Sequence, residues 1–262
     1  MLRTRIVVGA DGSPSSIAAV RWAAAEAELR DAELRVLTAY QRQVPGQQGD
    51  AGAASIVHEA VRQARSVAPG IDVRGIAHPG YAAPMLLHAA EEAVLLVVGD
   101  RARGSVPGQP AGSVGSQVAT QARTSVVVVR GRPDCDTGPV VVGIDSDAAG
   151  EAIVKRAFEE AAMRGAPVLA VTAASEGGRS AAKEALGTEL DGRLDPWRQK
   201  FPHVHAEHEY VSGRPDQVLV DRCEQARLVV VGPRRHGYEG VLLGAVGSRL
   251  LRRADCPVLI AR

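Results

Sequence analysis

The sequence predicts two copies of one α/β domain, each a doubly wound five-stranded parallel sheet with helices on both faces. An internal repeat is the first observation: the segment 6–11 (IVVGAD) returns at 140–145 (VVVGID), and 95–99 (LLVVG) returns at 228–232 (LVVVG). Within each copy, short apolar runs alternate with stretches of helical period, as βαβ units do. The runs VVVG and VVVV show no polar alternation, which is typical of parallel strands covered on both faces.

The repeat also sets the expected domain boundaries. The first domain is predicted at 1–131, a linker at 132–138 and the second domain at 139–262. The segment 131–139 contains two glycines and two prolines, residues that interrupt regular structure.

The elements of the first copy follow from the same patterns. Strands are expected near 4–9, 34–39, 71–77, 94–99 and 125–129, and helices near 14–30, 53–67, 82–91 and 113–122. Ser13 and Pro14 supply an N-cap and a proline at the first helical position. An apolar stripe that includes Ile17, Val20 and Leu29 follows, and the helix is predicted to end at Arg30 and Asp31.

Composition excludes several classes of partner. The chain is 45% hydrophobic and 23% charged, with 31 basic and 30 acidic residues, so no field of one sign is available to hold nucleic acid or an anionic membrane. Neither a signal peptide nor an uninterrupted apolar run of membrane-spanning length is evident. The three cysteines are far apart, without metal or disulfide spacing. We therefore expect a cytoplasmic protein with reduced thiols, in which Cys256 is a small buried residue.

The site is expected beyond the carboxyl ends of the strands, where doubly wound sheets bind ligands. Asp11 and Asp145 close the first strand of each copy, and an aspartate there can accept hydrogen bonds from an exocyclic amine or a ribose hydroxyl. The alternative interpretation is purely local, because aspartate also forms turns and caps helices.

A glycine-bearing segment follows the fourth strand of each copy. In the first copy Gly99 and Ala102 are followed, after nine residues, by Gly112, Ser113 and Val114. Glycines let backbone N–H groups approach phosphate oxygens, and the amides of a helix that begins at Ser113 would face the same anion. In the second copy Gly232 and Gly244 occupy the corresponding places. Together with the acidic turn, this pattern indicates a phosphate site.

These residues resemble the universal stress protein family, and specifically its tandem-domain members. The resemblance rests on IVVGADGSPSSIAAVRWAAAEA, LLVVGDRARG and GSVGSQVATQARTSVVVVRG in the first copy, and on VVVGIDSDAAGEAI, GRPDQVL and the segment from LVVVGPRRHG to the last strand in the second. The resemblance implies ATP binding, because one branch of the family carries Gly, two residues, Gly, nine residues, then Gly followed by Ser or Thr.

Both copies depart from that pattern. Ala102 replaces the second glycine in the first copy. In the second copy Arg235 replaces it, the spacing to Gly244 is one residue short, and Ala245 replaces the hydroxyl residue. Gly247 and Ser248 would restore the pattern only with a local shift. The first site is therefore expected to be the better kept.

Other candidate chemistry is weaker. His203, His205 and His208 fall near one strand, where a solvated edge strand is favoured over a metal site, and no metal ligand set is predicted. No nucleophile motif, P-loop or general base beside the phosphate segment is present, so no catalytic residue is predicted.

Two functions remain open. One is an ATP-binding stress or regulatory protein, its adenine nucleotide bound with or without Mg²⁺, that acts on an unidentified protein partner. The other is a scaffold that has lost nucleotide affinity. An adenylyl-transferring enzyme is disfavoured because the first turn reads DGSPSS and not Ser-Gly-Gly. In single-domain relatives dimers form through the last strand, which predicts pairing of 126–129 with 258–260 into an internal pseudo-dimer and leaves open a further homodimer.

Overall fold

The structure is a computed structural model that describes residues 4–41, 49–100, 113–144, 150–174, 180–236 and 240–262. Within these ranges the side chains of 49–50, 113, 174, 180–189, 234–236 and 240–242 are not described. The chain divides into two compact units, 1–133 and 134–262.

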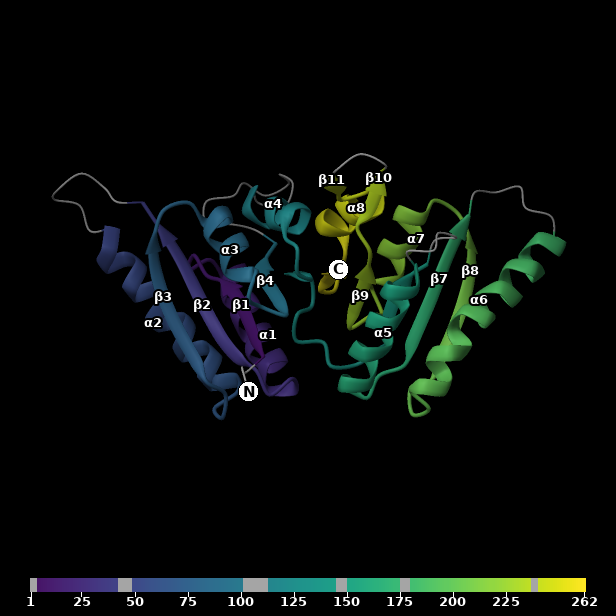
Figure 1. The fold of residues 1–262 in the computed structure, drawn as a ribbon, viewed down its shortest axis with the longest axis horizontal. Helices are drawn as coiled ribbons and strands as arrows, with labels where there is room; N and C mark the ends of the chain where they lie inside the picture. The colour runs from purple at the N-terminus through teal and green to yellow at the C-terminus, as the bar shows by residue number, and fades with distance from the viewer. Residues whose placement is uncertain (1–3, 42–48, 101–112, 145–149, 175–179, 237–239) are drawn as a thin grey trace. The chain divides into compact units, whose positions relative to one another are not determined.

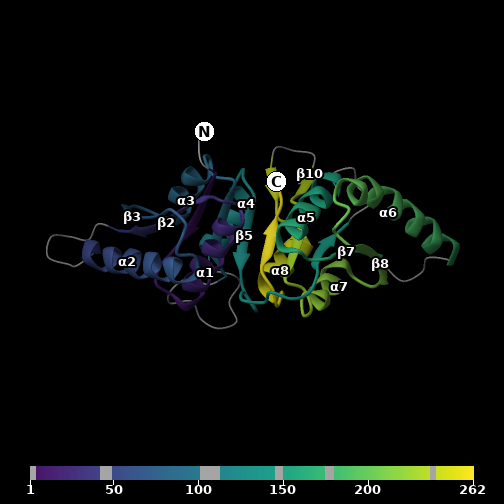
Figure 2. The same cartoon turned by 90° about the horizontal axis from the view of Figure 1, so that it is seen from below.

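The first unit is a parallel sheet of strand order β3-β2-β1-β4-β5. Helices α1 and α2 cover one face of this sheet, and α3 and α4 cover the other (Figures 1 and 2). Its elements are β1 (Arg5–Gly9), α1 (Pro14–Leu29), β2 (Glu33–Tyr40), α2 (Gly49–Val67), β3 (Val73–Pro79), α3 (Ala82–Ala90), β4 (Leu95–Gly99), α4 (Ser113–Gln121) and β5 (Val126–Val129).

The second unit repeats this plan with strand order β12-β9-β6-β7-β8, again parallel throughout. Its elements are β6 (Val140–Gly143), α5 (Gly150–Arg164), β7 (Val168–Ala174), α6 (Ser180–Lys200), β8 (Ala206–Ser212), α7 (Pro215–Arg222), β9 (Leu228–Val231), β10 (Arg234–His236), β11 (Gly240–Leu242), α8 (Ala245–Arg253) and β12 (Val258–Ile260). The predicted pair of doubly wound five-stranded sheets is confirmed.

The central strands form the core of each unit. In β1, Ile6, Val7 and Val8 are fully buried, and all four valines of β5 are at most 1% exposed. Both faces of these strands are therefore covered by helices, as the absence of polar alternation predicts.

The start of α1 is also confirmed. The Ser13 hydroxyl accepts a hydrogen bond from the Ser16 amide at 3.2 Å, and Pro14 is the first helical residue. The predicted apolar stripe is wrong in part, because the Leu29 side chain is 49% exposed. The buried face consists mainly of small residues, chiefly Ala19, Ala23 and Ala27, which let the helix lie close against the sheet.

A hairpin within the second unit was not predicted. Strands β10 and β11 are antiparallel and pair Arg235 with Val241. The backbone at Arg235, which stands where the family pattern has a glycine, is thus extended and paired. The sequence signal for this hairpin is the pair Gly237 and Gly240, which enclose a short segment between a polar run and an apolar run.

Candidate functional site

The first unit contains a pocket at the carboxyl ends of β1 and β4, where the strand order reverses. In the order β3-β2-β1-β4-β5 the chain runs outward from β1 in one direction and from β4 in the other, and such a switch point is where open α/β sheets bind ligands. The empty volume of the pocket is about 560 Å³, including space open to solvent. Its lining is Gly9, Ala10, Asp11, Ser16, Leu37, Ala39, Ala82, Met85, Leu86, Val98, Gly99, Val114 and Gly115.

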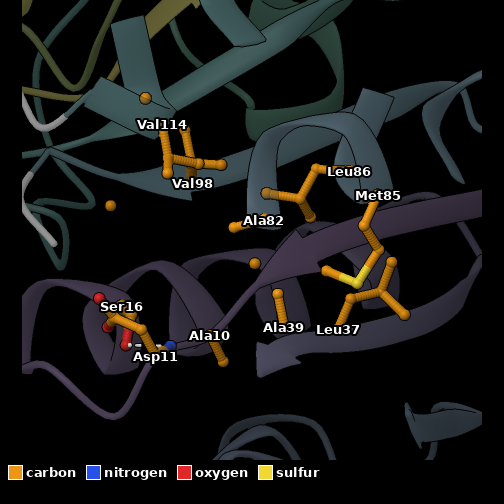
Figure 3. A pocket seen from close by; sticks show the side chains of 13 residues that line it. Ala10, Asp11, Ser16, Leu37, Ala39, Ala82, Met85, Leu86, Val98 and Val114 are labelled. Carbon is orange, nitrogen blue, oxygen red and sulfur yellow. Dashed lines mark hydrogen bonds between the residues drawn. The ribbon is translucent and has the colours of Figure 1, made fainter. Parts of the chain in front are cut away.

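The lining of this pocket is polar on one side only. Asp11 and Ser16 come from the start of α1, whereas Leu37, Met85 and Leu86 come from β2 and α3 and form an apolar wall opposite (Figure 3). Val98 and Val114 close a third side. An amphipathic ligand with one flat apolar part and one polar part fits such a lining.

Asp11 is held in place by the turn that begins α1. Its Oδ1 accepts a hydrogen bond from the Ser13 amide at 2.9 Å, and its own amide donates to the Ser16 hydroxyl at 3.3 Å. The side chain therefore performs the local turn-forming role foreseen as the alternative interpretation, while it also lines the pocket. Ser13, and not Asp11, is the N-cap of α1.

Gly99 lines the pocket and also brings two elements together. A β-carbon at this position would lie 2.7 Å from the carbonyl carbon and oxygen of Ser15. The end of β4 thus meets the first turn of α1 too closely for any other residue. The glycine has a packing role that holds whether or not a phosphate binds.

The glycine-bearing segment is described only at its ends. Ser113 is the first residue of α4, and Val114 lines the pocket. Ala102 and Gly112 lie outside the described residues, and so does Asp145 of the second unit.

The second unit has a pocket at the corresponding place, with an empty volume of about 1330 Å³, including space open to solvent. Gly232 and Gly244 both line it. Gly244 is the N-cap of α8, which begins at Ala245, just as α4 begins at Ser113 after Gly112. Gly247 and Ser248 therefore do not replace the expected pair, and the Ser248 hydroxyl donates to the Leu243 carbonyl at 3.3 Å.

A charged cluster distinguishes the second pocket. Arg214 donates two hydrogen bonds to Asp216, at 3.2 and 3.0 Å, and Arg249 donates a third to Asp216 at 3.4 Å. Burial raises the pKa of Asp216, but the hydrogen bonds from Arg214 and the charges of both arginines outweigh it and lower that pKa below its usual value. Sequence reasoning did not single out these residues, although Arg214 and Asp216 lie within the quoted GRPDQVL.

Of the candidate histidines, only His208 lies in β8, an edge strand of the second sheet, whereas His203 and His205 precede that strand. The His205 ring contacts Glu207 at 2.8 Å, and His208 contacts Asp191 at 3.1 Å. No group of three metal-ligating side chains occurs in the described part of the chain. Cys256 is fully buried, as expected.

The fold and its two pockets define a tandem doubly wound α/β protein with a pocket at the switch point of each sheet. The model of the universal stress protein family matches residues 3–130 and again 137–262. Universal stress protein Rv2623 of Mycobacterium tuberculosis is 35% identical, over 98% of this chain and 96% of the relative, and Rv2005c of the same organism is 31% identical over the same shares. The chain belongs to the universal stress protein family.

A solved structure supports the same fold over the full length. The crystal structure of a universal stress protein from Archaeoglobus fulgidus is similar with a TM-score of 0.75 at 15% identity, covering 100% of this chain and 99% of that one. No helix in the part of the chain that the structure describes is long and apolar enough to cross a bilayer.

Proposed function

We propose that this protein binds ATP and acts as a regulatory protein of the stress response, without catalysis, through a protein partner. The observation that carries the proposal is the first pocket, in which Asp11 and the start of α4 face an apolar wall from β2 and α3. The wall suits a purine, Asp11 suits an amine or hydroxyl donor, and the N-terminal amides of α4 suit a phosphate.

The first pocket is proposed as the tighter ATP site. It keeps Gly112 and Ser113 at the family spacing, whereas in the second unit Ala245 replaces the hydroxyl residue and the paired Arg235 replaces the second glycine. The proposal includes Mg²⁺ only as a companion of the nucleotide phosphates.

The test is equilibrium dialysis with labelled ATP after stripping of co-purified ligand. Asp11→Asn keeps an oxygen that can accept from the Ser13 amide, so the turn persists, but it presents an NH₂ group to a ligand donor. We expect ATP affinity at the first site to fall about tenfold or more, as for loss of a hydrogen bond to a charged group. Absence of binding by the unaltered protein at millimolar ATP would refute the proposal.

Asp145→Asn is the matched variant in the second unit. A smaller loss than that of Asp11→Asn supports the stated preference, whereas equal losses contradict it.

A scaffold without nucleotide affinity is the second candidate, favoured by Ala102 and by the paired backbone at Arg235. A thermal-shift measurement separates the two, because a ligand of the native state raises the melting temperature by mass action. A scaffold would show no shift with adenine nucleotides.

A further inference from the structure

The two units differ at the residue before the helix that follows the third strand of each sheet in chain order. This residue is Tyr81 before α3 and Arg214 before α7. Both have extended backbone dihedrals and neither caps its helix through its side chain. Arg214 lines the second pocket, and its side chain is 78% exposed. The same place in two copies of one fold thus carries an aromatic ring in one and a guanidinium in the other.

The partners of Arg214 are also particular to the second unit. Asp216, whose side chain is 10% exposed, corresponds to the buried Ala83 in the first unit, and Arg249 corresponds to Gln117. All three members of the cluster are therefore replaced by uncharged residues in the first copy. A purely structural role shared by both copies does not explain the cluster.

The geometry places Arg214 on the side of the pocket where α8 begins. Asp216 Oδ2 is 3.0 Å from an Arg214 nitrogen and 3.4 Å from an Arg249 nitrogen. Arg249 is four residues into α8, and helical side chains lean toward the N-terminus. Arg214 consequently lies beside the first turns of α8, whose residues Ala245, Val246 and Gly247 line the same pocket.

The cluster retains both charge and donors. Two arginines and one aspartate sum to one positive charge, and the two hydrogen bonds to Asp216 occupy two of the five N–H donors of the Arg214 guanidinium. The remaining donors can bind an anion in the pocket, with the guanidinium plane already oriented by Asp216.

We propose that Arg214 binds a phosphate group of the ligand in the second pocket and makes that pocket select polyphosphorylated nucleotides, with Asp216 and Arg249 as positioning residues. The proposal rests on the nucleotide-binding function given above. Arg214 would supply the hydrogen-bond donor that this copy lacks at Ala245, where the family pattern has a hydroxyl residue. Ligand binding in the first pocket, whose described lining contains no arginine, is expected to depend less steeply on phosphate number.

The test is hydrogen exchange of the full-length chain with ATP or adenosine, followed separately in peptides that cover 245–253 and 113–121. In Arg214→Gln, the ATP affinity measured from protection of 245–253 is expected to fall about tenfold to a hundredfold, the range for loss of a charged hydrogen bond. The protection of 245–253 by adenosine is expected to stay unchanged. Tyr81→Gln is the matched control and should not alter 245–253. Arg214→Lys should restore part of the loss, since lysine keeps the charge without the planar fork.

The result that overturns the proposal is unchanged ATP protection in Arg214→Gln, or an equal loss for ATP and adenosine. Inorganic triphosphate distinguishes this failure from failure of the proposed function. If ATP protects neither unit but triphosphate protects 245–253 in an Arg214-dependent way, the phosphate site holds and ATP binding fails. If neither compound protects 245–253 in the unaltered protein, the Arg214 proposal is wrong.

Discussion

At the scale of single residues, one amino acid in this protein can have a structural role and also line a pocket. Asp11 forms the turn before α1 and lines the pocket, and Gly99 lines the same pocket while it lets the first turn of α1 lie close to the end of β4. Asp11, Gly99 and Val114 were predicted for the site from sequence and do line the pocket. The apolar wall of Leu37, Met85 and their neighbours was not predicted, because ordinary aliphatic residues give no signal that separates a pocket from a core.

The packing role of Gly99 makes a stability prediction. In Gly99→Ala the new β-carbon overlaps the backbone of Ser15, which cannot move as a side chain can. We expect the free energy of unfolding to fall by about 1–3 kcal/mol, as for other overpacked sites, measured by urea denaturation.

Gly52→Ala is the matched control. Gly52 lies inside α2, where a β-carbon would contact nothing within 4 Å. This variant should stabilise the protein by about 0.5–1 kcal/mol, because alanine favours a helix over glycine. Equal behaviour of the two variants would contradict the packing role of Gly99.

At the scale of elements, the strands and the first helix follow from local patterns, whereas two features do not. Ser13 and Pro14 fix the start of α1 through local capping, which a sequence displays directly. The buried alanine face of α1 escaped prediction because alanine is also the most common exposed helix former. The β10–β11 hairpin escaped because its strands have only three residues each.

Helices α7 and α8 are joined through Asp216, which makes acid stability a test of that contact. The pKa of Asp216 is lowered in the folded state, so its contribution is present above the pKa of an unfolded aspartate and is lost as pH falls through the lowered folded pKa. We expect Asp216→Asn to lower the urea midpoint at pH 7. The difference in urea midpoint between this variant and the unaltered protein is expected to narrow progressively as the pH falls.

Fluorescence of Trp197 in a Trp22→Phe background reports this transition from the second unit alone. Glu159→Gln, which alters a half-exposed carboxylate on α5, is the control and should give a small gap. A gap for Asp216→Asn that stays constant between pH 7 and pH 3 would exclude the ion pairs as its source.

At the scale of the whole molecule, the two copies share more than the strand motifs that reveal the repeat. The buried Glu26 pairs with Arg30 in α1, and the buried Glu160 pairs with Arg164 at the same relative place in α5. Sequence alone predicted the two sheets because their central strands are uninterrupted apolar runs. It did not predict the charged cluster of the second pocket, since Arg214 and Arg249 are 35 residues apart and ordinary in composition.

Two compact units, each with its own pocket, predict separable responses to ligand. At ATP concentrations about a hundredfold above the dissociation constant, a liganded unit gains about 2.7 kcal/mol. We expect thermal unfolding followed by Trp22 to shift upward with ATP, and Asp11→Asn to reduce this shift while leaving that of Trp197 unchanged. Loss of both shifts in this single variant would show that the two sites are coupled.

The close approach at Gly99 has a consequence for how such chains change over evolutionary time. A substitution there is removed by selection for folding even in a descendant that no longer has any ligand, because the contact with Ser15 is part of the fold. The first glycine of the motif is thus expected to persist in descendants that have lost the binding function. Loss of binding is expected to begin with substitutions in the interior of the glycine-bearing segment, where both copies of this chain already differ from the family pattern.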